Sequence, residues 1–511
     1  MVNNTALGSK TGKGFYKKIK DKAGKSKILR LDFESMDYVE QKKVNFDILS
    51  KARKIKTSKE KFKFLVSGDD RASNFYKENF SRMFHYIQNR IPEISDSIVS
   101  IDQAMKAGFG WKDGPFEIWN YIGINEGKEL MKLYGLETAK WVDDILSNGY
   151  NEFYRKSEGI VQYYDLTSKK YKTKPGQEGF IILKNIIENK VVWSNSEATL
   201  YDIGNDIVNL EFSSKMNVIN QNIISSLKKG VEIAEKDFKG LVIGNEGSHF
   251  SAGADISMIF LLSIEQEYDE LNHVMKIFQD TMMRLRYSAI PVVAAPHGYT
   301  LGGGCELCLQ CDAVVPYSET YIGLVEAGIG LLPGGGGMKE MILRASDKFK
   351  KNDVEVNILQ EYFMNIGMGK TATSGFEGFE LDYFIKGRDI TVMNKKNQIN
   401  IAKQKALNLF DAGYTKPIER SDIKVLGKQA LGMLYVGVDS LRAGDYISDH
   451  DKKIANKIAY VLCGGDLSQP SKVSEQYLLE LEREAFISLC GERKTLERMQ
   501  YMLKNGKPLR N

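Results

Sequence analysis

Three segments between residues 246 and 337 combine small residues, glycines and acids in an order that suits chemistry on a carbonyl group. They are EGSHFSAGADI (Glu246–Ile256), HGYTLGGGCELCLQCD (His297–Asp312) and YIGLVEAGIGLLPGGGG (Tyr321–Gly337). Small residues after a strand let a ligand approach the backbone and leave amides free to donate. Glycines before a helix present unpaired N–H groups at the positive end of the helix dipole. Two such amides converging on one oxygen would form an oxyanion hole, worth about 3–4 kcal/mol per donor.

Two acidic residues accompany these amides. We expect Glu306 in the first turn of a helix that begins near Cys305, and Glu326 in the apolar loop GLVEAG after the next strand. Desolvation would raise the pKa of the Glu326 carboxyl, as an acid/base group requires. Two carboxylates facing one water can orient it, accept its proton and return a proton to carbon. A lone Glu is usually solvated or capping and a lone Gly-Gly-Gly is usually a turn, so the prediction depends on the joint order of the three segments.

The cysteines and histidines near these segments are interpreted as structural. The run CELCLQC invites a metal interpretation, but it lacks a fourth cysteine in the right place. On a helix Cys305, Cys308 and Cys311 fall roughly on one face, which favours packed thiols, and no metal site is predicted. His249 and His297 flank the pocket segments, but the two acids already cover the proton transfers.

The elements that must hold these residues alternate between short β-branched runs and helical stretches. The runs TLYDIG, DIVNLEF, GLVIGN, IPVVAAPHG, DAVVPY and YIGL are predicted strands, with helices over Asn217–Ala234 and Glu265–Tyr287. Such alternation favours parallel βαβ units with the chemistry at strand ends. Residues 60–160 are predicted to be helical, from the spacing of Phe80, Met83, Phe84 and Ile87. Residues beyond about 345 are again mostly helical, ending in a charged amphipathic stretch, Val473–Leu503.

Composition limits the class of protein. A chain of 511 residues favours two to four domains, and 42% hydrophobic with 27% charged residues is typical of a globular protein. The net charge of +5 indicates no nucleic-acid partner, and no run reaches the roughly 18 apolar residues that a membrane span requires. The N-terminus lacks an apolar core, so no signal peptide is expected. Five cysteines then indicate reduced thiols and a cytoplasmic location.

The three segments resemble the crotonase superfamily, and specifically the enoyl-CoA hydratases. HFSAGADI resembles the loop that embraces the adenine and the thioester, which implies the Ser251 amide as one oxyanion donor and Ala252, Gly253, Ala254, Asp255 and Ile256 as CoA-binding residues. LGGGCE resembles the second oxyanion segment. This implies Gly303 as the other donor and Glu306 as the first catalytic carboxylate, with Glu326 as the second.

The flanking regions resemble another family. GSKTGKGFY and IDQAMKAGFGWKDGPFEIWNYIG resemble the C-terminal helical domains of 3-hydroxyacyl-CoA dehydrogenases, and the tail resembles the end of bacterial fusions of dehydrogenase and hydratase. The fold class expected is α/β, a crotonase (ββα spiral) domain with flanking all-helical domains of the dehydrogenase type. The expected divisions are 1–30, a remnant of a first helical domain; 31–165, a second helical domain; 166–190, a linker; 191–345, the crotonase core; and 346–511, a helical C-terminal region.

The resemblance also lacks one expected part. Such fusions begin with a Rossmann domain carrying a G-x-G-x-x-G loop for NAD, and neither this loop nor the dehydrogenase's His–Glu pair is present, so Met1 resembles an internal methionine of a longer ancestor. We therefore expect no cofactor on this chain by itself: NAD is not expected, and the CoA thioester is the substrate. The dehydrogenase half is expected to be inactive alone.

The resemblance implies reversible addition of water to a trans-2-enoyl-CoA in fatty-acid β-oxidation, with Glu326 donating the proton to the α-carbon and Glu306 activating the water. Two alternatives stay open. One is a Δ3,Δ2-enoyl-CoA isomerase, which needs one carboxylate; the other is a non-catalytic or split subunit that requires a separate NAD-binding chain. Expected partners are an acyl-CoA and either further copies of this chain or that NAD-binding subunit, with no nucleic acid and no membrane.

Overall fold

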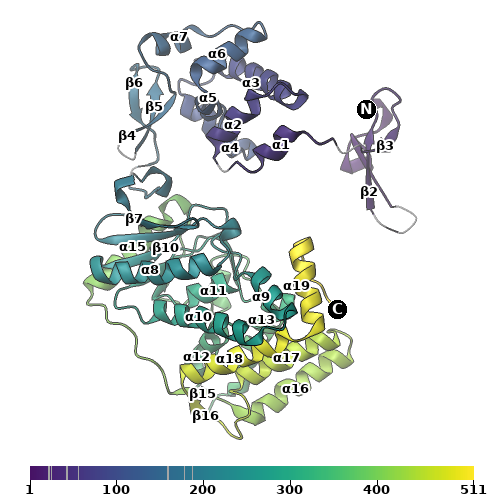
Figure 1. Cartoon of the computed structure of the whole chain (residues 1–511), viewed down its shortest axis with the longest axis vertical. Helices are drawn as coiled ribbons and strands as arrows, with labels where there is room; N and C mark the ends of the chain where they lie inside the picture. Colours follow the sequence, from purple (N-terminus) through teal and green to yellow (C-terminus); the bar gives the residue numbers. More distant parts are fainter. Residues whose placement is uncertain are drawn as a thin grey trace. The chain divides into compact units, whose positions relative to one another are not determined.

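The computed structural model describes residues 1–20, 24, 26–41, 44–55, 57–157, 160–177, 179–186, 188–350 and 352–511. The chain divides into two compact units, Met1–Lys174 and Pro175–Asn511. Each unit has its own buried core, so each is described by itself (Figure 1).

The first unit begins with β-structure. Strands β1 (Tyr16–Lys20), β2 (Ser26–Leu31) and β3 (Tyr38–Glu40) form an antiparallel sheet in the order β1-β2-β3, preceded by two 3-10 turns, η1 (Val2–Asn4) and η2 (Ser9–Thr11). The expectation of a helical remnant at residues 1–30 is therefore wrong for the described residues. The alternating exposure along β1 shows the two-residue period of a strand.

A cluster of helices follows, as the spacing of apolar residues predicts. The helices are α1 (Asp47–Ala52), α2 (Ser58–Ser67), α3 (Arg71–Asn89), α4 (Ile98–Phe109), α5 (Pro115–Ile122), α6 (Ile124–Leu133) and α7 (Lys140–Ser147). Their core is aromatic: the ring of Trp119 stacks on Phe84 at 4.8 Å and meets Phe153 edge-on at 5.0 Å. Strands β4 (Tyr154–Ser157), β5 (Ile160–Asp165) and β6 (Lys170–Thr173) close this unit as an antiparallel sheet.

The second unit is built on a six-stranded sheet in the order β13-β11-β10-β9-β8-β7. Its strands are β7 (Val191–Ser194), β8 (Ala198–Asp202), β9 (Ile207–Phe212), β10 (Gly240–Ile243), β11 (Val292–Ala294) and β13 (Ala313–Val314). The pairs between β9, β10, β11 and β13 are parallel, and β7 and β8 run antiparallel. The predicted βαβ units are confirmed.

Helices cover both faces of this sheet, because successive side chains of a strand point to opposite sides. Leu241 and Ile243 belong to the same buried cluster as the apolar face of α8 (Gln221–Asp237), whereas Val242 belongs to the cluster of α15 (Gln398–Asp411). Helix α10 (Tyr268–Arg286) packs against α8 (Figure 1). Residue 240 is a glycine where space is short: a β-carbon there would lie 3.0 Å from the Ile207 side chain.

A second, two-stranded layer carries the chemically interesting segments. Strands β12 (Gly298–Leu301) and β14 (Thr320–Gly323) are parallel. Helix α11 (Gly303–Leu309) follows β12, and the 3-10 turn η6 (Glu326–Ile329) follows β14. Because parallel strands end at the same edge, the start of α11 and η6 lie next to each other. The backbone bond from Gly302 N to Gly323 O, 2.9 Å, ties the two ends together.

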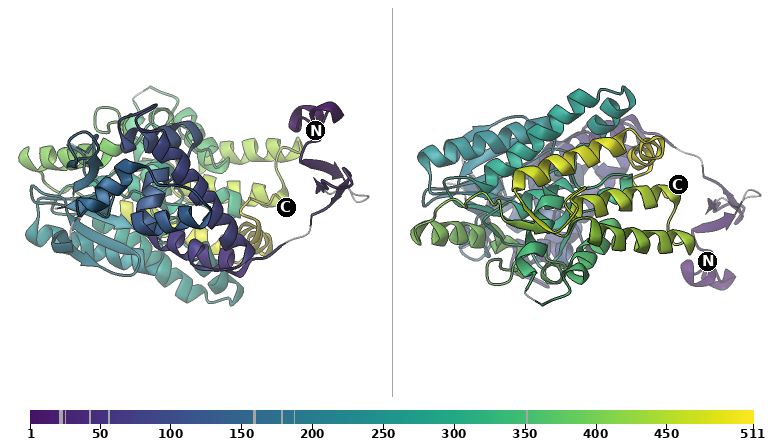
Figure 2. Two further views of the ribbon diagram at one scale, coloured as in Figure 1. Left: turned by 90° about the horizontal axis from the view of Figure 1, so that it is seen from above. Right: turned by 90° about the horizontal axis from the view of Figure 1, so that it is seen from below.

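The C-terminal region packs on the same core as the sheet. Its elements are α12 (Gly337–Lys348), α13 (Glu355–Gly367), α14 (Glu377–Glu380), β15 (Ile423–Val425), α16 (Gly427–Ala443), α17 (Asp449–Leu462), β16 (Ser471–Val473), α18 (Glu475–Cys490) and α19 (Arg493–Asn505). The right view of Figure 2 shows the yellow and yellow-green helices of this region together. The predicted stretch Val473–Leu503 forms two helices, α18 and α19, separated at Gly491 and Glu492.

The remaining short elements connect these layers. They are α9 (Ile256–Ile264), η3 (Leu183–Asn185), η4 (Glu188–Lys190), η5 (Lys215–Asn217) and η7 (Lys395–Asn397). In the part of the chain that the structure describes, no helix has the length and apolar character needed to cross a membrane. The cysteines of α11 and its end are buried in the core as free thiols, which confirms the packed-thiol prediction.

Candidate active site

The backbone amides of Gly303 and Ala254 are neighbours at the entrance of α11. A carbon built at the β-position of Gly303 would lie 3.1 Å from the Ala254 nitrogen, and one on Gly253 would lie 3.5 Å from the Gly303 nitrogen. Neither amide has an acceptor in the described residues. Gly303 is the first residue of its helix, so its N–H points away from the helical ladder. The two amides are placed to share one carbonyl oxygen.

The prediction that the Ser251 amide is an oxyanion donor is wrong. This amide donates to Tyr299 O at 3.0 Å, as in a parallel bridge, and the residue is completely buried outside the cavity. The Ser251 hydroxyl donates to Asn217 O at 2.7 Å and accepts from Gly253 N at 3.1 Å. Ser251 therefore holds the loop in place. The loop's turn at Gly253, with φ of +103°, presents Ala254. Gly253, three residues after Phe250, was the feature of the sequence that could have indicated Ala254 as the donor.

Glu306 lies in the first turn of α11, as predicted, with its carboxylate buried against the glycine run that precedes α12. Its Oε1 accepts from Gly335 N at 2.7 Å and from Gly337 N at 3.0 Å. Burial raises the pKa of Glu306 to about 7, and the two amide bonds oppose this shift. Glycine is needed at 335, since a β-carbon there would lie 2.3 Å from the Phe278 ring and 2.7 Å from the Glu306 Oε2.

Glu326 is the first residue of η6 and lies near the glycine that precedes α11. A β-carbon on Gly302 would lie 2.9 Å from the Glu326 Oε1, which places this carboxylate beside the start of α11. Its Oε2 is buried without a hydrogen-bond partner in the described residues. Burial, followed by the charge of Glu306, raises the pKa of Glu326 well above the usual carboxyl range. Glu326 therefore holds its proton to higher pH than an exposed carboxyl.

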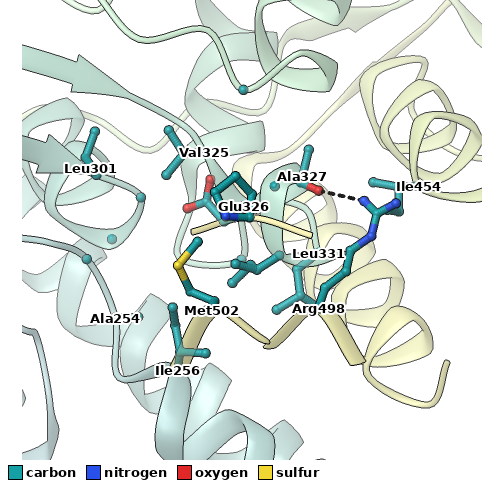
Figure 3. A pocket seen from close by; sticks show the side chains of 18 of the residues that line it. Ala254, Ile256, Leu301, Val325, Glu326, Ala327, Leu331, Ile454, Arg498 and Met502 are labelled. Carbon is teal, nitrogen blue, oxygen red and sulfur yellow. Dashed lines mark hydrogen bonds between the residues drawn. The ribbon is translucent and has the colours of Figure 1, made fainter. Parts of the chain in front are cut away.

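Both carboxylates and both amides line one cavity of about 890 Å³. The five predicted CoA-binding residues, 252–256, also line it. Much of the rest of its wall is apolar. The C-terminal helices α13, α17, α18 and α19 contribute Phe363, Ile454, Phe486 and Met502, and the charged residues Asp451 and Arg498 also line it. Figure 3 shows the Glu326 carboxylate near Val325 and Met502.

Helix α19 holds the turn that carries Glu326. Arg498 is buried and donates to Ala327 O at 3.3 Å, the bond drawn in Figure 3, while its guanidinium pairs with Asp451 at 2.8 Å. One turn earlier, Thr495 donates to Gly330 O at 2.9 Å. Both ends of η6 are therefore bonded to one helix from the C-terminal region.

The histidines lie outside the cavity wall. His297 faces Gly247 O at 2.9 Å, and His249 stacks on Tyr299 with ring centroids 4.3 Å apart. Burial lowers the pKa of His297 to about 4, so it is neutral near pH 7. No group of three or more His, Cys, Asp or Glu in the described residues could hold a metal ion.

Two family models match the chain. Residues 202–350 match enoyl-CoA hydratase/isomerase, and residues 82–175 match the 3-hydroxyacyl-CoA dehydrogenase, C-terminal domain. The first match contains both carboxylates and both amides of the cavity. Residues 202–350 are a crotonase-family domain. Residues 82–175 are a domain of the dehydrogenase C-terminal type, and they include the helices α4 to α7.

Curated relatives match this chain over nearly its whole length. A probable 3-hydroxyacyl-CoA dehydrogenase of Bacillus subtilis (strain 168) is 41% identical over all of this chain and 63% of its own length. A putative fatty acid oxidation complex trifunctional enzyme of Rickettsia felis is 26% identical over 99% of this chain and 62% of its own length. The chain thus spans about three fifths of the length of these relatives. Among solved structures, an enoyl-CoA hydratase from Bacillus halodurans matches with a TM-score of 0.41 and 16% identity, covering 60% of this chain and 99% of that one.

One acid that contacts the crotonase-family domain was not predicted from the sequence. Glu482 lies on α18, 132 residues beyond the end of the domain at residue 350, and is completely buried. Its Oε1 accepts from Gly336 N at 2.6 Å and its Oε2 from Lys339 N at 3.0 Å. A glutamate amid the apolar face of a helix was the available signal, but only the fold shows which loop it meets.

Proposed function

We propose that this chain adds water to the double bond of a trans-2-enoyl-CoA thioester. The observation that carries the proposal is the placement of Glu306 and Glu326 in the same cavity as the paired amides of Ala254 and Gly303. The amides would bind the thioester oxygen and stabilise the negative charge that forms on it in the transition state. Fatty-acid oxidation is the setting that the relatives' names support.

The protons balance between the two acids. Ionised Glu306 takes a proton from water as the water oxygen bonds to C3, and protonated Glu326 gives a proton to C2. The two acids exchange this proton again before the next turnover. The surroundings support this assignment: two amides hold the Glu306 carboxylate, whereas the Glu326 Oε2 has no donor in the described residues. The acid with the higher pKa keeps the proton.

The test is replacement of each acid by its amide. Glu306→Gln and Glu326→Gln should each lower kcat for hydration of crotonyl-CoA by at least about 100-fold, the usual contribution of a general acid or base. The dissociation constant for butyryl-CoA, which has no double bond to hydrate, should change less than about threefold. Glu480→Gln, an exposed acid on α18, is the matched control. Near-normal turnover in either site variant would refute the assignment.

An isomerase is the second candidate, because moving a double bond needs one carboxylate. Product analysis with a 3-enoyl-CoA separates the two reactions: appearance of the 2-enoyl thioester without hydration would favour the isomerase.

We also propose that this chain alone binds no NAD and that any dehydrogenation requires another polypeptide or segment. In support, the described part of the first unit holds helices and two antiparallel three-stranded sheets, not a strand–glycine loop–helix unit for a dinucleotide. Fluorescence titration with NADH tests this, and saturable binding would contradict it. The free thiols support a reducing compartment, and we propose the cytoplasm.

A further inference from the structure

Glu482 and Glu306 share the amides of one short loop. The loop Gly334–Gly337 leads into α12, and its successive amides go to alternate acids: Gly335 N and Gly337 N to Glu306, and Gly336 N to Glu482. Lys339 N, in the first turn of α12, also donates to Glu482. Two buried carboxylates thus occupy the positive end of one helix dipole from opposite sides.

The glycine loop leaves little freedom for either acid. A β-carbon on Gly337 would lie 2.8 Å from the Glu306 Oε1, and one on Gly334 would lie 2.7 Å from Phe486. Gln279 of α10 fixes the other end, donating to Gly334 O at 3.0 Å and to the Glu482 Oε1 at 3.4 Å. Arg483 orients this amide by donating to the Gln279 Oε1 at 2.6 Å. A displacement of Glu482 therefore displaces the two amides that hold Glu306.

Within the described residues Glu306, Glu326 and Glu482 take part in no ion pair. Four buried or partly buried cations around them pair with other acids. Lys339 pairs with Glu340 and Glu475, Arg286 with Glu340 and Glu475, Arg344 with Glu340, and Arg498 with Asp451. Helix α9, which also packs on α18, carries no charged residue. Burial and the charge of Glu306 raise the pKa of Glu482 to about 8, and Glu482 adds to the rise at Glu326.

We propose that Glu482 is a positioning residue for the catalytic acids: it holds Glu306 through the glycine loop and adds a third buried carboxyl to this group of acids. This inference rests on the proposed hydration. It extends the active site to α18, outside the crotonase-family domain. Glu482 does not line the cavity, so it acts through the loop and through its charge and touches no substrate.

The experiment compares Glu482→Gln, Glu482→Asp and Glu484→Gln, an exposed acid on the same helix, in the full chain. The amide of Gln cannot accept from both Gly336 N and Lys339 N, so the loop shifts, and kcat for crotonyl-CoA should fall about tenfold or more with KM within twofold. Loss of the charge should also lower the pKa of Glu326. The alkaline limb of the kcat profile, where Glu326 loses its proton, should therefore move to lower pH.

Glu482→Asp keeps the carboxyl group, but the side chain is one methylene shorter and the carboxyl lies farther from the loop amides. Its alkaline limb should stay near that of the unmodified chain while kcat falls, and Glu484→Gln should match the unmodified chain in both. A purely structural residue would lower the melting temperature and leave the limb in place, which would overturn the proposal. If Glu482→Gln does not fold, an unchanged kcat in Glu482→Asp would overturn it equally.

A readout independent of turnover separates this inference from the proposed function. The infrared band of protonated carboxyls, followed during a pH titration, reports the buried acids without substrate. In the unmodified chain the contribution of Glu482 to this band is first subtracted. The remaining band should disappear at a lower pH in Glu482→Gln than in the unmodified chain. If the unmodified chain hydrates no enoyl-CoA, the proposed function fails, whereas an unshifted band shows that Glu482 is not coupled to the pair.

Discussion

The carboxyls of Glu306 and Glu326 differ in their bonding although they line the same cavity. Two amides of the glycine loop hold one oxygen of Glu306, whereas Glu326 has a buried oxygen without a donor in the described residues. Two side chains of the same type therefore have unequal surroundings. Because these carboxyls interact, each apparent pKa in a titration describes the group of acids together and not one residue.

Hydration should depend on pH with an acid limb near neutrality. The pKa of Glu306 is raised from 4.5 to about 7, so below pH 7 its carboxyl is increasingly protonated and unable to accept a proton from water. We expect kcat/KM to rise with pH through about 7 and to fall again at higher pH as Glu326 loses its proton. A pH profile with crotonyl-CoA measures this. An acid limb near pH 4.5 would show that burial does not shift Glu306.

The paired amides predict the effect of one methyl group. In Gly253→Ala the new β-carbon would lie 2.9 Å from Leu301 O and 3.5 Å from Gly303 N, at a φ of +103°. We expect kcat to fall at least about tenfold, since the methyl crowds the oxyanion site, and stability to fall by about 1–3 kcal/mol. Kinetics and urea unfolding measure the two effects.

Gly432→Ala is the matched control for this substitution. Gly432 is exposed on α16, and a β-carbon there meets nothing within 4 Å. It should keep full activity and gain about 0.5–1 kcal/mol of stability, because alanine favours a helix interior. Full activity in Gly253→Ala would instead place the oxyanion donors elsewhere.

At the scale of elements, the site depends on contacts between segments far apart in the chain. Turn η6 bears Glu326, but α19 bonds to its carbonyls, and α18 bonds to the loop that holds Glu306. The C-terminal helices thus form part of the cavity wall as well as of the core.

The substitution Arg498→Met should test whether η6 depends on its bonds to α19. It removes the donor to Ala327 O and leaves Asp451 without its ion-pair partner, so we expect a loss of about 2–3 kcal/mol in the free energy of unfolding. Freed from α19, η6 should also place Glu326 less well and lower kcat about tenfold. Arg493→Met, at an exposed site of the same helix, should change stability by less than about 0.5 kcal/mol. Equal kcat in the two variants would show that α19 does not position Glu326.

At the scale of the whole molecule, the chain holds two units with separate cores. The described residues that line the cavity all belong to Pro175–Asn511, and the aromatic core around Trp119 belongs to Met1–Lys174. A chain reduced to residues 175–511 should therefore fold by itself and keep kcat/KM for crotonyl-CoA within about threefold. Circular dichroism and hydration assays measure this. A loss of hydration by a folded fragment would assign the first unit a role in catalysis.

Much of the fold could be predicted from local patterns. The β-branched runs became strands, and the glycines before Cys305 became the start of α11, because both depend on neighbours within a few residues. Residues 1–30 could not be predicted in this way. A resemblance to a helical domain suggested helix, whereas Tyr16–Lys20 pairs with Ser26–Leu31 as strands.

The amino-acid sequence by itself determined the two acids, Glu306 and Glu326, and the glycines that leave their amides open, because these are properties of residue type and spacing. Only the tertiary structure decided that the Ser251 amide is consumed by Tyr299 and that Ala254 stands beside Gly303. It also decided that Glu482 meets the glycine loop 146 residues before it. The physical reason is that hydrogen-bond partners and burial depend on which segments the folded core brings together, and no local spacing encodes that.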